Sequence, residues 1–183
     1  MADIKIVVAD ASHEKYVDTI LDTIREAAKK RGTGIAERTH EYVATKMKEG
    51  KAAIALKGEE FVGFCYLECW ENQKFIANSG LIVRPEFRGQ GIARGIKKII
   101  VEICREMFPD ASIFGITKSK SVMKMNQELG FRLASFDELT TDPKFWKGCD
   151  TCPHFPELLE NDYKSCQCTG LLYKLFLLFH YDL

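Results

Sequence analysis

The fold of this chain is decided by residues 81–94, which read LIVRPEFRGQGIAR. The apolar residues at the start indicate the end of a buried strand, and Pro85 ends its hydrogen-bonded ladder because proline has no N–H. Gly89 and Gly91 form a short turn, and isoleucines then recur at positions 92, 96, 99, 100 and 103. This is the spacing of one apolar helix face. The stretch therefore predicts a strand, a glycine turn and a helix in immediate succession.

The start of this helix has the features of an anion site. The first N–H groups of a helix have no intrahelical partner and lie at the positive end of its dipole. Glycine allows the backbone to adopt φ > 0 and to approach a phosphate closely. Arg88 and Arg94 add positive charge, and Lys97 and Lys98 follow one turn later. Together these features predict a site for a diphosphate.

The motif differs from two common phosphate-binding patterns. It lacks the third glycine of the dinucleotide fingerprint and the Gly-Lys-Ser/Thr of the P-loop. Residues 88–93, RGQGIA, behind Val83-x-Pro85, instead resemble the Q/R-x-x-G-x-G/A signature of the GNAT superfamily. Its members are N-acyltransferases that use acetyl-CoA or another acyl-CoA; the alternative is a plain strand–turn–helix junction. The resemblance implies that the cofactor contacts Leu81, Ile82, Val83, Arg88, Gly89, Gln90, Gly91, Ile92, Ala93, Arg94 and Asn126.

Composition limits the class of protein. The 183 residues are 46% hydrophobic and 28% charged, which is typical of one soluble globular domain, expected to span residues 1–183. The 26 basic and 26 acidic residues balance, so no nucleic-acid or membrane partner is indicated. The apolar runs at the N-terminus and at residues 171–179 are too short for a signal peptide or a membrane span. We expect a cytoplasmic protein, and a homodimer is left open.

The hydrophobic pattern predicts an α/β (α+β) chain. Strands are expected near residues 4–8, 52–56, 61–70, 75–83, 113–116 and 131–136, and helices near 12–30, 39–49, 92–107 and 119–129. This order resembles the GNAT fold, a mixed, mostly antiparallel sheet with helices on both faces. A last strand is expected at 171–179, after a Cys-rich insert at about 137–169. In this fold the strands before the glycine loop and after the long helix splay apart. By analogy, the backbones of Leu81 and Val83 would pair with the cofactor arm.

Transfer of an acyl group from a thioester to an amine needs a base, donors for the carbonyl oxygen and a proton for the thiolate. The superfamily often places an acidic Tyr four residues before a Gly-Phe pair, but here that position is Asn126. An amide can bond the cofactor arm and cannot act as an acid, so a thiol, another Tyr or water must do so. Glu68 is the candidate base, or else a solvated strand residue. Asn78 and Ser79 would hold a water relay, or only satisfy local backbone groups.

Acceptor recognition in this fold commonly involves the loop between the first two helices. We expect Arg31, Thr33 and Arg38 to bind an acceptor carboxylate there; exposed basic residues near helix ends are the alternative. Residues 31–36, 77–83, 113–117 and 145–149 together resemble a bacterial GNAT branch linked with arginine biosynthesis, to which acylation of the α-amino group of glutamate is ascribed. The expected function is transfer of an acetyl or other short acyl group to a small amino acid such as glutamate. A protein lysine or N-terminal acetyltransferase and a catalytically silent acyl-CoA-binding module are the alternatives.

The seven cysteines divide into two groups. Three fall on predicted strands or helices, where a free Cys is usually a small buried hydrophobe: Cys65, Cys69 and Cys104. Four lie within twenty residues of the insert: Cys149, Cys152, Cys166 and Cys168. Two close pairs of this kind resemble a structural zinc site, with His154 as a spare ligand. Free thiols and disulfides are the alternatives.

Overall fold

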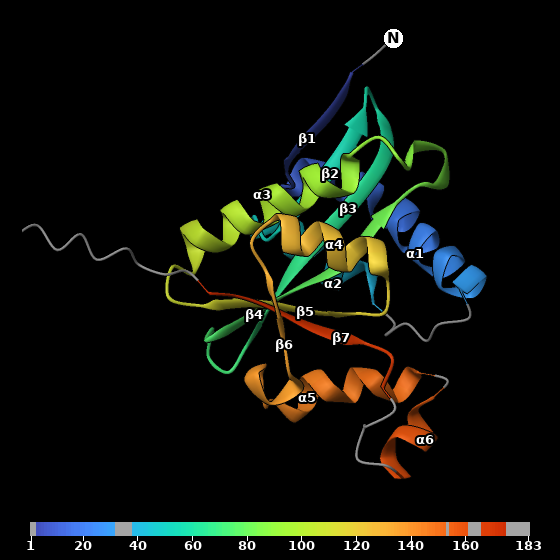
Figure 1. Cartoon of the computed structure of the whole chain (residues 1–183). Helices are drawn as coiled ribbons and strands as arrows, with labels where there is room; N and C mark the ends of the chain where they lie inside the picture. The colour runs from blue at the N-terminus through green and yellow to red at the C-terminus, as the bar shows by residue number, and fades with distance from the viewer. Residues whose placement is uncertain (1–2, 32–37, 153, 161–165, 175–183) are drawn as a thin grey trace, which may run out of the picture.

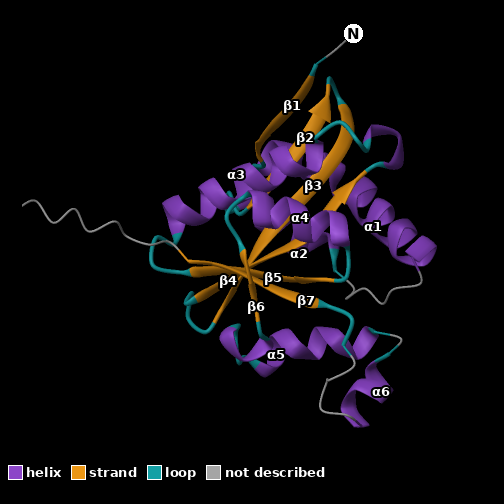
Figure 2. Cartoon of the chain, in the orientation of Figure 1, coloured by secondary structure: helices purple, strands orange, loops and turns teal. Residues whose placement is uncertain are grey.

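The computed structural model describes residues 3–31, 38–152, 154–160 and 166–174. Within them one sheet has the strand order β1-β2-β3-β4-β5-β7-β6 (Figures 1 and 2). The strands are β1 (Ile4–Val8), β2 (Ala52–Lys57), β3 (Glu60–Trp70), β4 (Phe75–Val83), β5 (Ser112–Thr117), β6 (Arg132–Ala134) and β7 (Thr169–Lys174). Neighbouring strands run antiparallel, except that β4 and β5 are parallel. The predicted mixed, mostly antiparallel sheet is confirmed.

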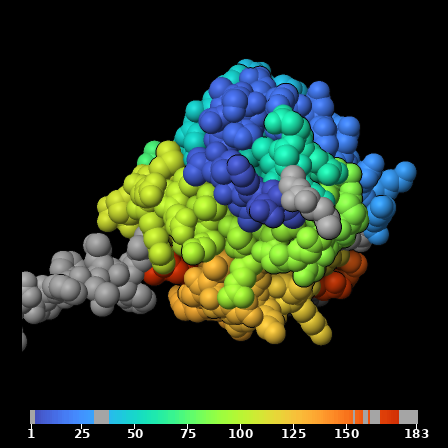
Figure 3. Space-filling view, turned by 90° about the horizontal axis from the view of Figure 1, so that it is seen from above, coloured from blue at the N-terminus to red at the C-terminus, as the bar shows by residue number. Residues whose placement is uncertain are grey.

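Helices cover both faces of this sheet, as the sequence predicted. On one face α3 (Ile92–Met107) crosses β1 to β4, and α4 (Lys120–Glu128) packs on β5, β6 and β7. On the other face α1 (Val17–Arg31) packs against β3 and β4, and α2 (His40–Lys48) packs against β2. Figures 1 and 3 show β1 lying directly against α3. We call these two faces the α3 face and the α1–α2 face.

Sequence features explain why the main helices form where they do. The isoleucines of α3 at 92, 96, 100 and 103 are buried in the core between the helix and the sheet. Each contributes about 1.5–3 kcal/mol by leaving water. Thr39 begins α2, since its hydroxyl accepts a bond of 3.1 Å from the backbone nitrogen of Tyr42. Ser119 begins α4 in the same way, through the nitrogen of Val122 at 3.4 Å.

Three boundaries differ from the sequence-based expectation. The first helical region opens as a 3-10 helix, Ala11–Tyr16, whose cap is Asp10 rather than Ser12. The strand expected at 131–136 ends at Ala134, because Ser135 and Glu138 form a capping box that turns the chain. The last strand begins two residues early, at Thr169, and residues 175–179 lie outside the described part. Among the described residues, no helix combines the length and the apolar character needed to cross a membrane.

The insert packs against the α1–α2 face of the sheet, beyond the area that α1 and α2 cover. It contains α5 (Pro143–Trp146), a 3-10 helix (Lys147–Thr151) and α6 (Phe155–Glu160), which lie below the sheet in Figure 1. The ring of Phe145 lies with its centroid 4.9 Å from that of Phe114 on β5. Glu71, at the turn after β3, accepts bonds from the Thr140 hydroxyl at 2.7 Å and the Thr141 nitrogen at 2.6 Å. The insert therefore holds the turn between β3 and β4.

Strand β4 carries the two irregularities that create the site. Its parallel pairing with β5 covers Phe75 to Ala77 and no later residue, so the two strands diverge from Asn78 onward. Its pairing with β3 shifts register between Ser79 and Ile82, which leaves a bulge at residues 80 and 81. Gly80 has φ +67°, and a Cβ atom there would clash with the Tyr66 ring. The splay predicted by analogy is thus present, and the bulge lies at its opening.

Candidate active site

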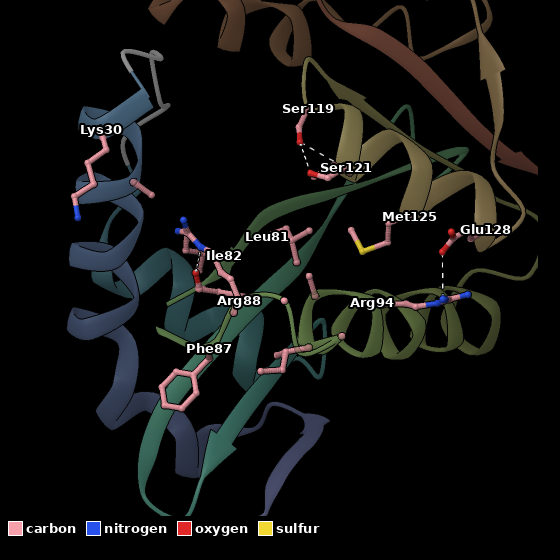
Figure 4. Close-up of a pocket in the computed structure, with 17 residues that line it drawn as sticks. Lys30, Leu81, Ile82, Phe87, Arg88, Arg94, Ser119, Ser121, Met125 and Glu128 are labelled. Atoms are coloured by element: carbon pink, nitrogen blue, oxygen red, sulfur yellow. Dashed lines mark hydrogen bonds and ion pairs between the residues drawn. The ribbon is translucent and has the colours of Figure 1, made fainter. Parts of the chain in front are cut away.

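A cavity of about 490 Å³ opens beside the outer half of β4, between helices α1 and α4 and the start of α3 (Figure 4). Its wall and floor include every predicted cofactor residue except Gln90 and Asn126. The remaining lining comes from α1, from the loop before α3 and from α4: Ala27, Lys30, Phe87, Ser119, Ser121, Val122, Met125 and Glu128. The strand, the glycine turn and the helix that the sequence placed in succession therefore form one continuous surface.

The glycine turn presents backbone N–H groups to this cavity. Gly89 and Gly91 both have φ +78°, a conformation that other residues rarely adopt. A Cβ atom on either would meet nothing within 4 Å, so the space above the turn is open. Gly91 is the N-cap of α3 without a side-chain bond, and the first turn holds no acidic residue. The N–H groups of Ile92 and Ala93 therefore remain for an anion.

Three cationic side chains border the cavity, and two of them already make contacts. Arg88 donates from Nε to the carbonyl of Val83 at 3.0 Å, so that carbonyl, which we expected to meet the cofactor arm, already accepts one bond. Arg94 on α3 pairs with Glu128 on α4, with Nη1 and Oε2 3.2 Å apart (Figure 4). Lys30 reaches the rim from α1. Lys97 does not join this group, because its side chain is 2% exposed and lies between α3 and the sheet.

The residues of the α3 face fit an acyl-CoA. The open glycine turn and the cations suit its diphosphate. Two buried amide atoms have no hydrogen-bond partner among the described residues: Nδ2 of Asn78, where β4 and β5 begin to splay, and Oδ1 of Asn126 on α4. Asn126 is 2% exposed and does not line the cavity. Unpaired buried polar atoms are costly, and a long polar arm between the strands would satisfy them.

A second group of polar side chains lies on the α1–α2 face of the same strands. Glu68 on β3 accepts a bond of 2.6 Å from the Tyr42 hydroxyl through Oε1. Its Oε2 accepts a bond of 2.5 Å from the Ser79 hydroxyl on β4. Burial and the Glu68 contact raise the pKa of Tyr42 well above its ordinary value, so Tyr42 stays a donor. Both carboxylate oxygens of Glu68 are thus held by neutral hydroxyl groups, which fix the orientation of the carboxylate and leave it lone pairs.

Arg38 lies beside this group, next to the ring of Tyr66. Its Nε donates to the Tyr66 hydroxyl, and its guanidinium carbon lies 5.4 Å from the centroid of that ring. Tyr66 meets Tyr42 edge to face, with centroids 5.9 Å apart. Burial and then the Glu68 charge raise the pKa of Tyr66. A cation and a carboxylate therefore lie on neighbouring positions of one face.

The two other predicted acceptor residues cannot be placed with Arg38. Arg31 is the last residue of α1 with its side chain outside the described part, and Thr33 lies outside the described residues. Sequence reasoning also missed Tyr42 and Tyr66. A signal for both exists, since Tyr66 and Glu68 are two apart on one strand and share a face. Tyr42 follows Arg38 by four residues at the start of a helix.

The four cysteines of the insert are free, half-buried thiols, and the predicted structural zinc site is not supported. Among the residues that the structure describes, no three or more His, Cys, Asp or Glu side chains are placed to hold a metal ion. Burial and then the neighbouring Cys166 raise the pKa of Cys168 to about 11, and burial also raises the pKa of Cys149. Both groups are therefore neutral thiols at neutral pH. His154 is exposed.

Comparison with known proteins gives the family. A family model described as "Acetyltransferase (GNAT) family" matches residues 21–131, which is more than half of the chain. The chain therefore belongs to the GNAT family, a class of acyl-CoA-dependent N-acyltransferases. None of the curated proteins compared with the chain matches it.

Solved structures show the same fold at low sequence identity. N-acetylglutamate synthase from Neisseria gonorrhoeae, complexed with coenzyme A and N-acetyl-glutamate, has 18% identity and a TM-score of 0.67. The match covers 96% of this chain and 36% of that chain, so this chain spans about a third of the synthase. Rv2747 from Mycobacterium tuberculosis, in complex with CoA and NLQ, has 17% identity and a TM-score of 0.64 over 94% of this chain and 99% of that one. Phosphinothricin acetyltransferase from Sinorhizobium meliloti, with AcCoA, has 19% identity and a TM-score of 0.57 over 72% and 76%.

Proposed function

We propose that this acyltransferase moves an acetyl or another short acyl group from acyl-CoA to the α-amino group of a small amino acid such as glutamate. The observation that carries the proposal is the position of Arg38, bonded to Tyr66, next to the Tyr42–Glu68–Ser79 group on the α1–α2 face. A guanidinium suits an acceptor carboxylate, and a carboxylate base beside it suits the ammonium of the same small molecule. The Neisseria synthase, which shares this fold, is complexed with N-acetyl-glutamate, and this supports the same acceptor class here.

Residues on one face of β4 bind the cofactor, and residues on the other face remove the proton from the acceptor. Bound acyl-CoA supplies a thioester, an acyl group already activated for attack by an amine. On the α3 face, the N–H groups after Gly91 bind the diphosphate, with charge from Arg88 and Arg94. On the other face, Glu68 takes a proton from the acceptor ammonium, directly or through a water. Ser79 donates to Glu68 and directly precedes the bulge at residues 80 and 81 in the chain. The base and the bulge are therefore held in a fixed relative position.

The group that protonates the leaving thiolate must differ from the tyrosine that the family often uses, because this chain has Asn126 at that position. Asn126 has no proton to give at neutral pH, and its buried Oδ1 suits it to accept a bond instead. We therefore assign the proton for the leaving thiolate to water. Burial and the Glu68 contact raise the pKa of Tyr42, so its hydroxyl is a poor acid and serves to hold Glu68.

A thiol-release assay with a panel of free amino acids tests this proposal. Acetyl-CoA and succinyl-CoA serve as donors, and glutamate should be among the best acceptors. N-acetylglutamate, which lacks the free amine, and glutamate dimethyl ester, which lacks the carboxylates, are the matched controls. Both should give only background release. Preference for a lysine peptide over every free amino acid would overturn the acceptor assignment.

A further inference from the structure

The buried Lys97 is unexplained by the sites described so far. It lies on the sheet side of α3 with 2% of its side chain exposed, and burial lowers its pKa. Among the described residues no carboxylate pairs with it. Its Nζ donates to Oδ1 of Asn78 and lies 5.9 Å from the centroid of the Phe131 ring, near the thiols of Cys65 and Cys104. A lysine is seldom placed so deeply without an ion pair, because its desolvation is costly.

Its partner Asn78 lies at the point where β4 and β5 begin to splay. The last paired residues are Ala77 and Phe114, so Asn78 and Gly115 face each other where pairing has ended. A Cβ atom on Gly115 would lie 3.6 Å from Oδ1 of Asn78, an ordinary contact distance, so the two positions are direct neighbours. The other end of the amide, Nδ2, is buried and has no partner among the described residues.

The lysine fixes which way this amide points. Nζ of Lys97 donates to Oδ1 of Asn78, so the oxygen of the amide faces the lysine and its NH₂ group faces away. This hydrogen bond also polarises the amide, which strengthens its N–H groups as donors. The result is an oriented, unsatisfied donor at the start of the splay between β4 and β5.

We propose that Asn78 donates a hydrogen bond to a carbonyl of the acyl-pantetheine arm of bound acyl-CoA, and that Lys97 is a positioning residue that orients and polarises this amide. The inference rests on the acyl-CoA half of the proposed function and is independent of the acceptor. It explains why a lysine is buried at this place.

The first test uses Asn78→Asp, which keeps the shape and the oxygen that Lys97 needs but removes the Nδ2 donor. Calorimetry compares CoA and acetyl-CoA with adenosine 3′,5′-bisphosphate, which has no arm. We expect acetyl-CoA to bind about tenfold more weakly and the bisphosphate to bind as it does to the native chain. An equal loss for CoA would identify an arm amide as the acceptor, and an unchanged CoA affinity would identify the thioester carbonyl. Unchanged affinity for both arm-bearing ligands, or an equal loss for the bisphosphate, would overturn the proposal.

The second test separates positioning from structural support. Lys97→Met and Arg105→Met, which removes an exposed cation from the same helix, are compared in a double-mutant cycle with Asn78→Leu. Lys97→Met should weaken acetyl-CoA binding several-fold in the native background and have no further effect beside Asn78→Leu, while Arg105→Met should leave acetyl-CoA binding unchanged. A purely structural lysine would lower the melting temperature in both backgrounds without any arm-specific loss. If Lys97→Met does not fold, the Asn78→Asp comparison still decides whether Asn78 is the donor.

These outcomes separate this inference from the broader proposal. A native chain that binds CoA, with no arm-specific loss in Asn78→Asp, overturns this inference alone. A native chain that binds no CoA would overturn the proposed function as well.

Discussion

The two faces of β4 form their sites in different ways, one mainly with backbone groups and the other with side chains. The α3 face is made mainly by the backbone: a glycine turn, the first N–H groups of α3 and a strand that leaves its neighbour. The α1–α2 face is made by side chains from separate elements, with Arg38 and Tyr42 near α2, Glu68 on β3 and Ser79 on β4. A backbone site depends on a short run of sequence, whereas a side-chain site depends on how distant segments meet. The comparison predicts that changes on one face affect the cofactor and changes on the other affect the acceptor.

The largest effect is expected for Glu68→Gln on the α1–α2 face. The amide keeps the size of the carboxylate but cannot take a proton from the acceptor, so turnover should fall by about 100-fold. The steady-state rate at saturating substrates measures this. Glu59→Gln, an exposed glutamate that bonds Lys15, is the matched control and should keep full turnover. Full activity in Glu68→Gln would place the base elsewhere.

Gly91→Val should mainly affect the other face. Valine at φ +78° strains the turn and reorients the N–H groups of the first helical turn, so the KM for acetyl-CoA should rise about tenfold. Gly148→Val is the control, because Gly148 also has open space around it but no left-handed backbone. An unchanged KM for acetyl-CoA in a folded Gly91→Val protein would remove the glycine turn from the cofactor site.

Arg38→Gln tests the acceptor half of the comparison. Loss of a charge-assisted bond to a carboxylate should raise the KM for the amino acid roughly tenfold, while the KM for acetyl-CoA stays constant. Arg25→Gln on α1, whose arginine pairs with Asp22 in solvent, should change neither constant. A rise in the KM for acetyl-CoA instead would contradict the division between the faces.

The smallest effect concerns a surface pair away from both faces. The Arg132 guanidinium, followed by the Ser135 backbone, lowers the pKa of Glu138 to about 2. A depressed carboxyl pKa stabilises the fold above the ordinary pKa, and this contribution is lost as pH falls towards 2. Glu138→Gln should therefore lower the melting temperature by about 1–2 °C at pH 7 and leave it unchanged near pH 2. The exposed Glu157→Gln should show no difference at either pH.

The sequence predicted the parts of the molecule that local chemistry decides. The strand, glycine turn and helix of residues 81–94 need only φ preferences and a helical period, and they lie where expected. Lys97 could have been excluded from the anion site, since it falls within the buried stripe of α3 between Ile96 and Ile100. The roles of Tyr42 and Tyr66 could not be ranked above those of other tyrosines, because their partners come from other elements.

The zinc hypothesis finds no support among the described residues, for a related reason. The spacing of Cys149 and Cys152 places two thiols near one another, but it says nothing about where a later pair arrives. The strand expected at 131–136 was also overestimated, because the capping box of Ser135 and Glu138 competes with the extended chain. In both places the prediction used a local sequence pattern, whereas the structure depends on how neighbouring segments are arranged.

The most direct test of the division between the two faces is a calorimetric titration of CoA into Glu68→Gln. This variant loses the base on the α1–α2 face and leaves the glycine turn, the cations and the splayed strands unchanged. We predict the same dissociation constant for CoA as in the native protein, despite the loss of turnover. A dissociation constant raised as far as that of Gly91→Val would show that the two faces act as one site and would contradict this account.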